Sequence, residues 1–314
     1  MIAEQTSTAY APFPLLTRGD ELGLETRVLH TPLGEMTVHA GRRDRTDETA
    51  TIMLHGAAGS WTTFTPLLQA ADLRGDATLR NVIIPDLPGW GASGFPADAD
   101  RFTIDRLTEA IAHAARSLGF DRWRVIGHSL GGTLALHLAV VESEATAGIT
   151  LVSPSAFGVL EAVTHPLGGL ARIPLFVGMR QTMRILAIRE QAGRAISRGL
   201  GRIGFTRGLA TPLFRHPSFI DASVYDALAA EVRPRAFTAA AEATRDYDAA
   251  TIWSQVACAA TVLRGDRDVF VAADDLPRLV ALVPRIRAIT VPDAGHFAHV
   301  ERPFEVLDTV GQAR

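Results

Sequence analysis

Short apolar runs alternate with helical segments along most of the chain, and this alternation constrains the fold more than any other feature. Continuous apolar runs at 51–55, 81–86 and 148–153 predict buried strands. Apolar side chains at helical spacing predict a helix over 103–118. Strands that alternate with helices form a mainly parallel sheet with helices on both faces. The sequence therefore predicts an α/β fold.

The alternation stops once, in the second half of the chain. Between the run at 148–153 and a strand pattern that resumes near Ala259, the sequence is helical in pattern and rich in Arg, Ala and Leu. We therefore expect residues 1–154 and 252–314 to form the core. Residues 155–251 are expected to form an inserted helical cap over one edge of the sheet.

The composition excludes several classes of function. A chain of 314 residues with 47% hydrophobic and 21% charged residues is expected to fold into a packed globular protein. Its net charge of −3 gives no electrostatic reason to bind nucleic acid. The chain has no lysine, which excludes a Schiff-base lysine, and its single cysteine, Cys258, excludes a cysteine metal cluster. We expect neither a metal nor an organic cofactor.

The first residues predict neither a targeting segment nor a regular element. They lack the basic region and apolar core of a signal peptide, and no run of 18 apolar residues occurs in the chain. We therefore expect a cytoplasmic protein in which residues 1–20 are a loose lead-in.

The segment "GHSLG", residues 127–131, has the pattern G-x-S-x-G between a predicted strand and a predicted helix. Small residues on both sides permit a sharp turn, and the start of the helix favours negative charge nearby. Ser129 is therefore a candidate nucleophile. An ordinary glycine-rich turn would carry the same pattern, so the assignment depends on a base, an acid and an oxyanion site elsewhere.

Loops after the later strands supply the base and the acid. His296 follows a predicted strand in a glycine-containing loop, where an α/β sheet carries functional groups, whereas His299 is expected to pack or cap the last helix. Asp266 and Asp268 both follow a strand. Asp268 lies further into the loop and is preferred as the acid, and Asp266 suits a turn. The loop after 148–153 offers no carboxylate.

The segment "HGAAGSW" follows an inner strand and predicts an oxyanion site. The backbone amides of Ala57 and Leu130 could both face a tetrahedral oxygen. Several side chains from separate loops are predicted to line an apolar substrate pocket, although they could equally pack the cap onto the core. These side chains are Trp61, Phe64, Trp90, Phe157 and His128.

With these segments the chain resembles the α/β-hydrolase fold superfamily over nearly its whole length. The matching segments are "HGAAGSW" (55–61), "DLPGWGAS" (86–93), "GHSLGG" (127–132), "GDRD" (265–268) and "GHFAHVERP" (295–303). The resemblance implies Ser129 as nucleophile, His296 as general base and acid, and Asp268 as the orienting carboxylate. Dehalogenases and epoxide hydrolases of this superfamily carry Asp in place of the serine, so neither chemistry is expected.

The expected reaction is hydrolysis of an apolar carboxylic ester or lactone through an acyl-enzyme, without a cofactor. Cleavage of a carbon–carbon bond, thioester hydrolysis, and a slow-turnover receptor that retains the three residues are the alternatives. The motifs do not choose among them.

Arginines gather in residues 171–207, which contain eight Arg and one acidic residue, Glu190. Helical spacing predicts one face that carries Arg180, Arg184, Arg194, Arg198 and Arg202. Ile185, Ile196 and Leu200 are predicted roughly opposite, although Gly193 disfavours one unbroken helix. We expect this face to be solvated, with no membrane contact. The alternative interpretation is attraction of anionic substrates or of a membrane surface.

Overall fold

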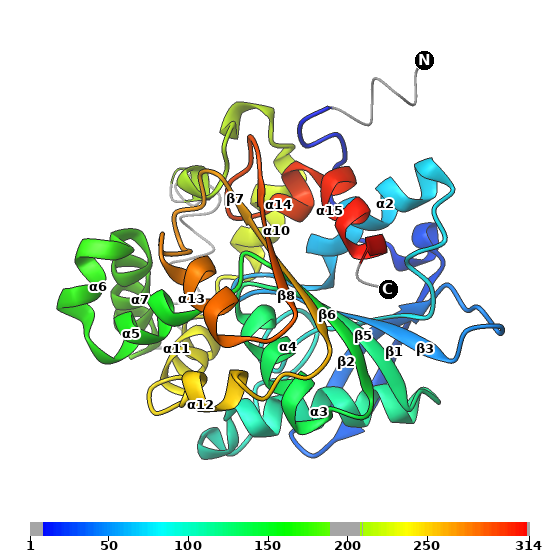
Figure 1. Cartoon of the computed structure of the whole chain (residues 1–314), viewed down its shortest axis with the longest axis horizontal. Helices are drawn as coiled ribbons and strands as arrows, with labels where there is room; N and C mark the ends of the chain where they lie inside the picture. Colours follow the sequence, from blue (N-terminus) through cyan, green and yellow to red (C-terminus); the bar gives the residue numbers. More distant parts are fainter. Residues whose placement is uncertain (1–8, 189–207, 209, 313–314) are drawn as a thin grey trace.

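A computed structural model describes residues 9–188, 208 and 210–312, and in them eight strands form one sheet (Figure 1). The strand order is β1-β2-β4-β3-β5-β6-β7-β8, and β2 alone runs antiparallel to both of its neighbours. The strands are β1 (Leu24–Thr31), β2 (Gly34–Gly41), β3 (Thr49–Leu54), β4 (Val82–Pro85), β5 (Arg122–His128), β6 (Thr146–Val152), β7 (Ala259–Gly265) and β8 (Ile286–Val291). The predicted mainly parallel α/β fold is confirmed.

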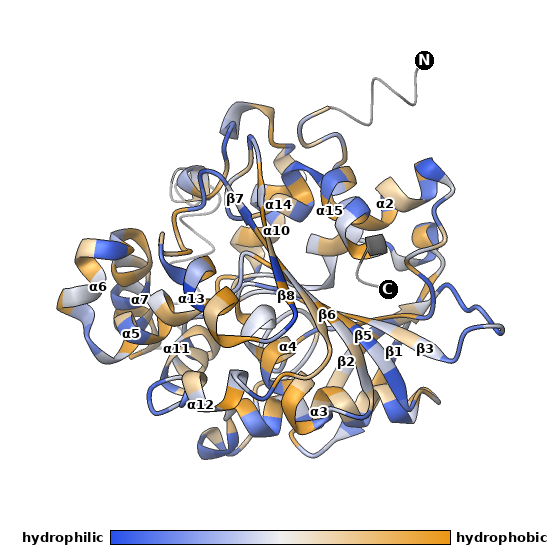
Figure 2. Cartoon of the chain, in the orientation of Figure 1, coloured by the Kyte–Doolittle hydropathy of each residue, from blue (hydrophilic) through white to orange (hydrophobic). Residues whose placement is uncertain are grey.

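Helices cover both faces of this sheet. They include α2 (Thr65–Arg74), α3 (Ile104–Ser117), α4 (Leu130–Val141), α13 (Asp275–Leu282), α14 (Ala298–Glu301) and α15 (Pro303–Gln312). Neighbouring side chains on a strand point to opposite faces. Ile52 of β3 therefore joins the core beneath α3 and α4, whereas Met53 joins the core beneath α2 and α15. Burial on both faces explains why β3, β4 and β6 read as mainly apolar runs. Figure 2 shows β3 and β6 largely in orange.

Helices are inserted between β6 and β7. They are α5 (Phe157–Thr164), α6 (Pro166–Arg172), α7 (Pro174–Ala187), α10 (Ala222–Ala230), α11 (Pro234–Glu242) and α12 (Ala249–Trp253). We call α5 to α11 the inserted helices. Helix α7 packs against α11, and α12 packs instead on α4 of the core. The helices α6, α7 and α11 each begin with proline, which fits the first helical turn because its missing N–H needs no partner there.

Short 3-10 turns connect several of these elements. They are η1 (Gly19–Leu22), η2 (Trp61–Phe64), η3 (Ala99–Arg101), η4 (Thr211–Leu213) and η5 (Pro217–Phe219). No helix in the described ranges is both long enough and apolar enough to cross a bilayer.

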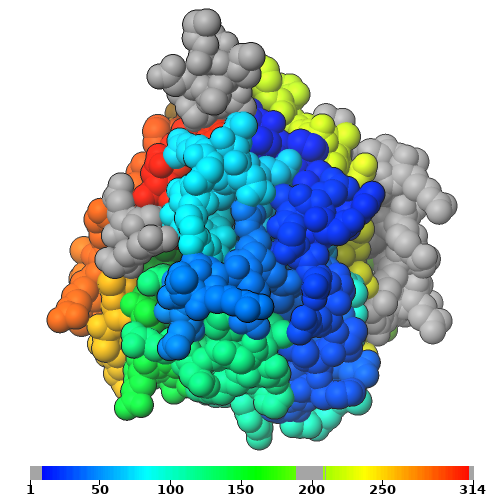
Figure 3. Space-filling view, turned by 90° about the vertical axis from the view of Figure 1, so that its right-hand side faces the viewer, coloured from blue at the N-terminus to red at the C-terminus, as the bar shows by residue number. Residues whose placement is uncertain are grey.

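The N-terminal segment, residues 9–16, is ordered by contacts and is not the loose lead-in that the sequence predicts. The Ala11 N–H donates to the Glu301 carbonyl, and the Leu16 N–H donates to the Thr65 hydroxyl. Figure 3 shows this segment (dark blue) between α2 (cyan) and the inserted helices (yellow-green). Its order depends on partners distant in sequence, which a local pattern does not reveal.

The predicted arginine face on α7 is only partly present, because Arg184 is exposed and Arg180 is not. Arg180 is buried, and its guanidinium donates to Glu242 of α11 at 2.9 Å. Ile185, expected roughly opposite the arginines, is itself 68% exposed. Arg180 points inward because the Glu242 carboxylate on the neighbouring helix α11 accepts its hydrogen bond. The rest of the arginine-rich segment, residues 189–207, lies outside the described residues.

Candidate active site

Ser129 occupies a strained turn between β5 and α4. Its backbone has φ 51° and ψ −116°, which L-residues rarely adopt. The flanking glycines permit this turn because neighbouring backbone lies very close. A Cβ on Gly127 would lie 2.2 Å from the Gly131 carbonyl oxygen, and a Cβ on Gly131 would lie 2.0 Å from that of Leu54. The glycines of the motif are therefore required by packing, and the turn holds the serine at the carboxyl end of the sheet.

His296 and Asp268 meet at the same end of the sheet. The His296 Nδ1 atom lies 3.0 and 3.2 Å from the two carboxylate oxygens of Asp268. The backbone N–H groups of Phe270 and Val271 also donate to this carboxylate. Burial alone would raise the pKa of Asp268, but the neighbouring imidazole and these donors together hold the pKa below its usual value. The carboxylate is therefore ionised and fixes which nitrogen of His296 carries the proton.

The two rejected residues have structural roles. The exposed Asp266 accepts a hydrogen bond from the Ala294 backbone, as expected for a turn residue. His299 is fully buried among rings of Phe64, His128 and Phe297. Burial lowers the pKa of His299 to about 3, so this imidazole is neutral near pH 7.

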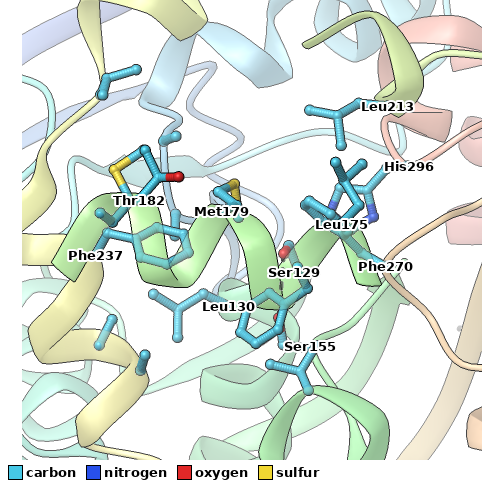
Figure 4. Close-up of a pocket in the computed structure, with 18 of the residues that line it drawn as sticks. Ser129, Leu130, Ser155, Leu175, Met179, Thr182, Leu213, Phe237, Phe270 and His296 are labelled. Atoms are coloured by element: carbon cyan, nitrogen blue, oxygen red, sulfur yellow. Dashed lines mark hydrogen bonds between the residues drawn. The ribbon is translucent and has the colours of Figure 1, made fainter. Parts of the chain in front are cut away.

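The Ser129 hydroxyl has a partner that the sequence did not reveal. The Oγ atoms of Ser129 and Ser155 lie 3.3 Å apart, as Figure 4 shows, and the Ser155 backbone N–H donates to the Ser129 carbonyl. Ser155 follows β6, which ends at the same sheet edge as β5. The sequence predicts only that this loop offers no carboxylate, and the position of Ser155 follows from the pairing of β5 with β6 in the sheet. His296 shares a cavity with both serines.

Backbone amides are available beside the serine. Ala57 and Leu130 both line the cavity, and in the described part of the chain neither N–H donates to a protein acceptor. A Cβ on Gly56 would lie 2.8 Å from the Ser129 Cβ, so the loop after β3 lies directly against the nucleophile turn. The buried His55 ring fixes this loop through the Gly56 carbonyl. Two backbone donors without a protein acceptor among the described residues therefore line the cavity beside Ser129.

The cavity has a volume of about 460 Å³ and lies between this sheet edge and the inserted helices. Its walls are apolar and include Phe176, Met179 and Met183 of α7 and Phe237 of α11. Figure 4 shows Met179 and Phe237 at this wall. His296 is the one ionisable side chain among the described residues that line it. Such a cavity suits a neutral, apolar ligand.

The side chains predicted to line the pocket lie elsewhere. Trp61 stacks on the His39 ring with ring centroids 4.2 Å apart, and Phe64 is fully buried in the core beneath α2. Trp90 is fully buried in the opposite core cluster. These aromatic side chains pack the protein interior, and the prediction that they contact substrate is wrong.

Phe157 and His128 were also predicted to line the pocket, and neither does. The Phe157 ring packs against Trp253 and lies under the Arg278 guanidinium. His128 lies behind the nucleophile turn, where its Nε2–H donates to the His296 carbonyl at 3.1 Å. His128 therefore joins the loop of His296 to the turn of Ser129 instead of contacting a ligand.

A sequence signal for the true wall did exist. Phe176, Met179 and Met183 recur at helical spacing, which predicts one apolar helix face. That spacing could not tell whether the face meets the sheet, another helix or a cavity.

Comparison with known proteins gives a family and several distant relatives. Residues 50–303 match the family described as alpha/beta hydrolase fold. The chain is 31% identical over 106 residues to a proline iminopeptidase of Heyndrickxia coagulans, a match covering 34% of this chain and 35% of the relative. It is 23% identical to the mouse sn-1-specific diacylglycerol lipase ABHD11, over 83% of this chain and 79% of the relative.

Two further similarities cover most of the chain. A Pseudomonas putida 2-hydroxy-6-oxononadienedioate/2-hydroxy-6-oxononatrienedioate hydrolase is 26% identical, over 82% of this chain and 85% of the relative. The solved structure of an esterase from Exiguobacterium antarcticum aligns with a TM-score of 0.69 at 15% identity, covering 92% of this chain and 98% of that one. At this identity the structural likeness concerns the fold.

Proposed function

The chain belongs to the α/β-hydrolase fold family, and on this premise we propose that it is a serine hydrolase of a neutral, apolar carboxylic ester or lactone. The single observation that carries the proposal is the apolar cavity. At one place its wall contains a hydroxyl, an imidazole and two unpartnered amides, from Ser129, His296, Ala57 and Leu130. These are the groups that acyl transfer requires.

In the proposed mechanism, the Ser129 hydroxyl first leaves Ser155 and turns to His296. The His296 Nε2 removes the proton as Oγ attacks the acyl carbon, and Asp268 stabilises the imidazolium that forms. The Ala57 and Leu130 amides hold the negative oxygen, each worth about 10²–10³-fold in rate. His296 then protonates the leaving alcohol, and water repeats the sequence to release the acid.

The inserted helices act as a cap in this proposal. Helices α7 and α11 supply much of the apolar wall, so they select the acyl group and exclude water from the tetrahedral intermediate. A cytoplasmic location belongs to the same proposal and is tested by cell fractionation.

The test is covalent labelling of the nucleophile. We expect a fluorophosphonate to add one group to the wild-type protein, with peptide mapping to Ser129, and p-nitrophenyl esters of acyl chains to be hydrolysed. Ser129→Ala should abolish both, while Ser254→Ala, an exposed serine directly after α12 whose hydroxyl donates to the Thr251 carbonyl, should retain the label. Labelling of Ser129→Ala equal to wild type would contradict the assignment.

Carbon–carbon bond hydrolysis is the second candidate, favoured by the relative from Pseudomonas putida. The compounds in that relative's name are dicarboxylates. The described cavity wall offers no arginine to pair with a carboxylate. We therefore expect neutral esters to be cleaved with a higher kcat/KM than such dienedioates, and the opposite ranking would favour the second candidate.

A further inference from the structure

Glu301 connects His296 to two distant parts of the chain. Its side chain is fully buried behind the His296 loop. The Gly295 N–H lies 2.9 Å from both carboxylate oxygens, and the Phe297 N–H lies 3.2 Å from one of them. One carboxylate therefore holds the backbone on both sides of His296.

The same carboxylate is held from outside the loop. The Tyr10 hydroxyl of the N-terminal segment donates to Glu301 Oε2 at 2.5 Å, and the Arg215 N–H donates to it at 2.8 Å. Tyr10 also accepts a hydrogen bond from the His216 backbone at 3.0 Å. The N-terminal segment, the chain between the inserted helices and the His296 loop thus meet at one buried group.

The partners of Glu301 fix its charge state. Each of the four groups is a donor, which suits an ionised carboxylate. Burial raises the pKa of Glu301, while the hydrogen bonds from Arg215, Tyr10, Gly295 and Phe297 oppose that rise. Burial and the charge of Glu301 also raise the pKa of Tyr10, so its hydroxyl stays protonated and continues to donate.

We infer that Tyr10, acting through Glu301, is a positioning residue for His296. The inference rests on the proposed function, in which His296 is the general base. Tyr10 lies outside the segment that matches the family, which begins at residue 50. Its hydroxyl orients the carboxylate that in turn fixes the backbone at Gly295 and Phe297.

This arrangement affects rate more than substrate affinity. Neither Tyr10 nor Glu301 lines the cavity. A small displacement of the imidazole lengthens the proton transfer from Ser129, and a misplacement of about 1 Å can cost about 10²-fold in rate. Because Glu301 accepts several hydrogen bonds, the loss of the Tyr10 bond alone should displace the His296 imidazole by less than this distance.

The experiment compares Tyr10→Phe with Tyr225→Phe as a matched control. Tyr225 packs in the same apolar cluster, and its hydroxyl donates to the Pro217 carbonyl. We expect Tyr10→Phe to lower kcat about tenfold with KM within about twofold. Tyr225→Phe should leave both within about twofold. Equal kinetics for the two variants would overturn the inference.

A double-mutant cycle with Glu301→Gln tests whether Tyr10 acts through Glu301. If it does, Tyr10→Phe has no further effect on kcat in the Glu301→Gln background. Fully additive losses would show that Tyr10 acts by another route and would also overturn the inference.

A proton NMR measurement tests this inference independently of the proposed function. The downfield proton NMR signal of the His296 Nδ1–H bound to Asp268 should shift or broaden in Tyr10→Phe but not in Tyr225→Phe. This readout needs neither turnover nor the Glu301 variant. If the wild-type protein showed neither esterase activity nor labelling, the proposed function would be contradicted. An unchanged NMR signal in Tyr10→Phe would instead contradict the positioning role of Tyr10.

Discussion

The Nδ1 atom of His296 lies 3.0 Å from Oδ1 of Asp268, although the two residues are 28 positions apart in the chain. The Asp268 side chain is fully buried, and it accepts the hydrogen bond as an anion. The proton is therefore kept on Nδ1, and the lone pair of Nε2 is left to face the cavity. This tautomer is the one that a general base for Ser129 requires.

Asp268→Asn should lower kcat by about 10⁴-fold, because an amide can donate to Nδ1 and stabilise the wrong tautomer. Asp266→Asn is the matched control, since Asp266 is exposed and its carboxylate accepts a hydrogen bond from the Ala294 backbone N–H. It should retain kcat within a few-fold. Steady-state hydrolysis of a p-nitrophenyl ester checks both variants, and the opposite ranking would move the acid to Asp266.

His299→Phe should make the protein more resistant to acid. The pKa of His299 is about 3 in the folded state and about 6.5 when unfolded, so only the unfolded chain takes up this proton between those values. Stability therefore falls as the pH drops below about 6.5. Between pH 8 and pH 4.5, the free energy of unfolding should therefore fall by about 3 kcal/mol less in His299→Phe than in the wild-type protein.

Urea unfolding of both proteins at the two pH values measures this difference. Activity should survive in His299→Phe, because the ring packs in the core and does not reach the cavity. His296→Ala should be inactive. If His299→Phe lost activity and His296→Ala retained it, the general base would be His299 and not His296.

The residues around Ser129 could be predicted from the sequence because their constraints are local. Gly127 and Gly131 are needed where backbone meets backbone, and this requirement leaves a short, readable pattern around the serine. The inner strands β3, β4 and β6 likewise read directly, since burial on both faces leaves them mainly apolar. His296 and Asp268 follow strands of the same sheet, so their proximity follows from the strand order.

The cavity wall could not be predicted in this way. An aromatic side chain such as Trp90 looks alike in a sequence whether it packs a core or contacts a ligand. Arg180 was expected in solvent because its partner, Glu242, is 62 residues away. The ordering of Tyr10 by Glu301 spans 291 residues and leaves no local pattern. Each of these features depends on contacts between segments distant in the sequence, which periodicity does not determine.

Gly131→Ala should destabilise the fold by about 3 kcal/mol, because its Cβ would lie 2.0 Å from the Leu54 carbonyl oxygen. The added methyl group forces α4 away from β3 and moves Ser129 with it, so activity should fall as well. Gly168→Ala in α6 is the control, since no described atom outside its chain neighbours and its own helix backbone lies within 4 Å of the added Cβ. It should be neutral or slightly stabilising. Urea denaturation distinguishes them, and equal stability of the two variants would contradict the packing argument.

Met179→Trp should shift the substrate preference toward short acyl chains. Met179 lies on the cavity face of α7, so a larger ring there removes volume from the apolar wall (Figure 4). Each methylene that can no longer be buried costs about 0.8 kcal/mol. The kcat/KM for an octanoyl ester should therefore fall at least about tenfold more than that for an acetyl ester. Ile185→Trp on the same helix is the control, because that side chain is 68% exposed and should leave the ratio unchanged. A loss in Met179→Trp that is equal for all chain lengths would show that the acyl group does not bind along α7.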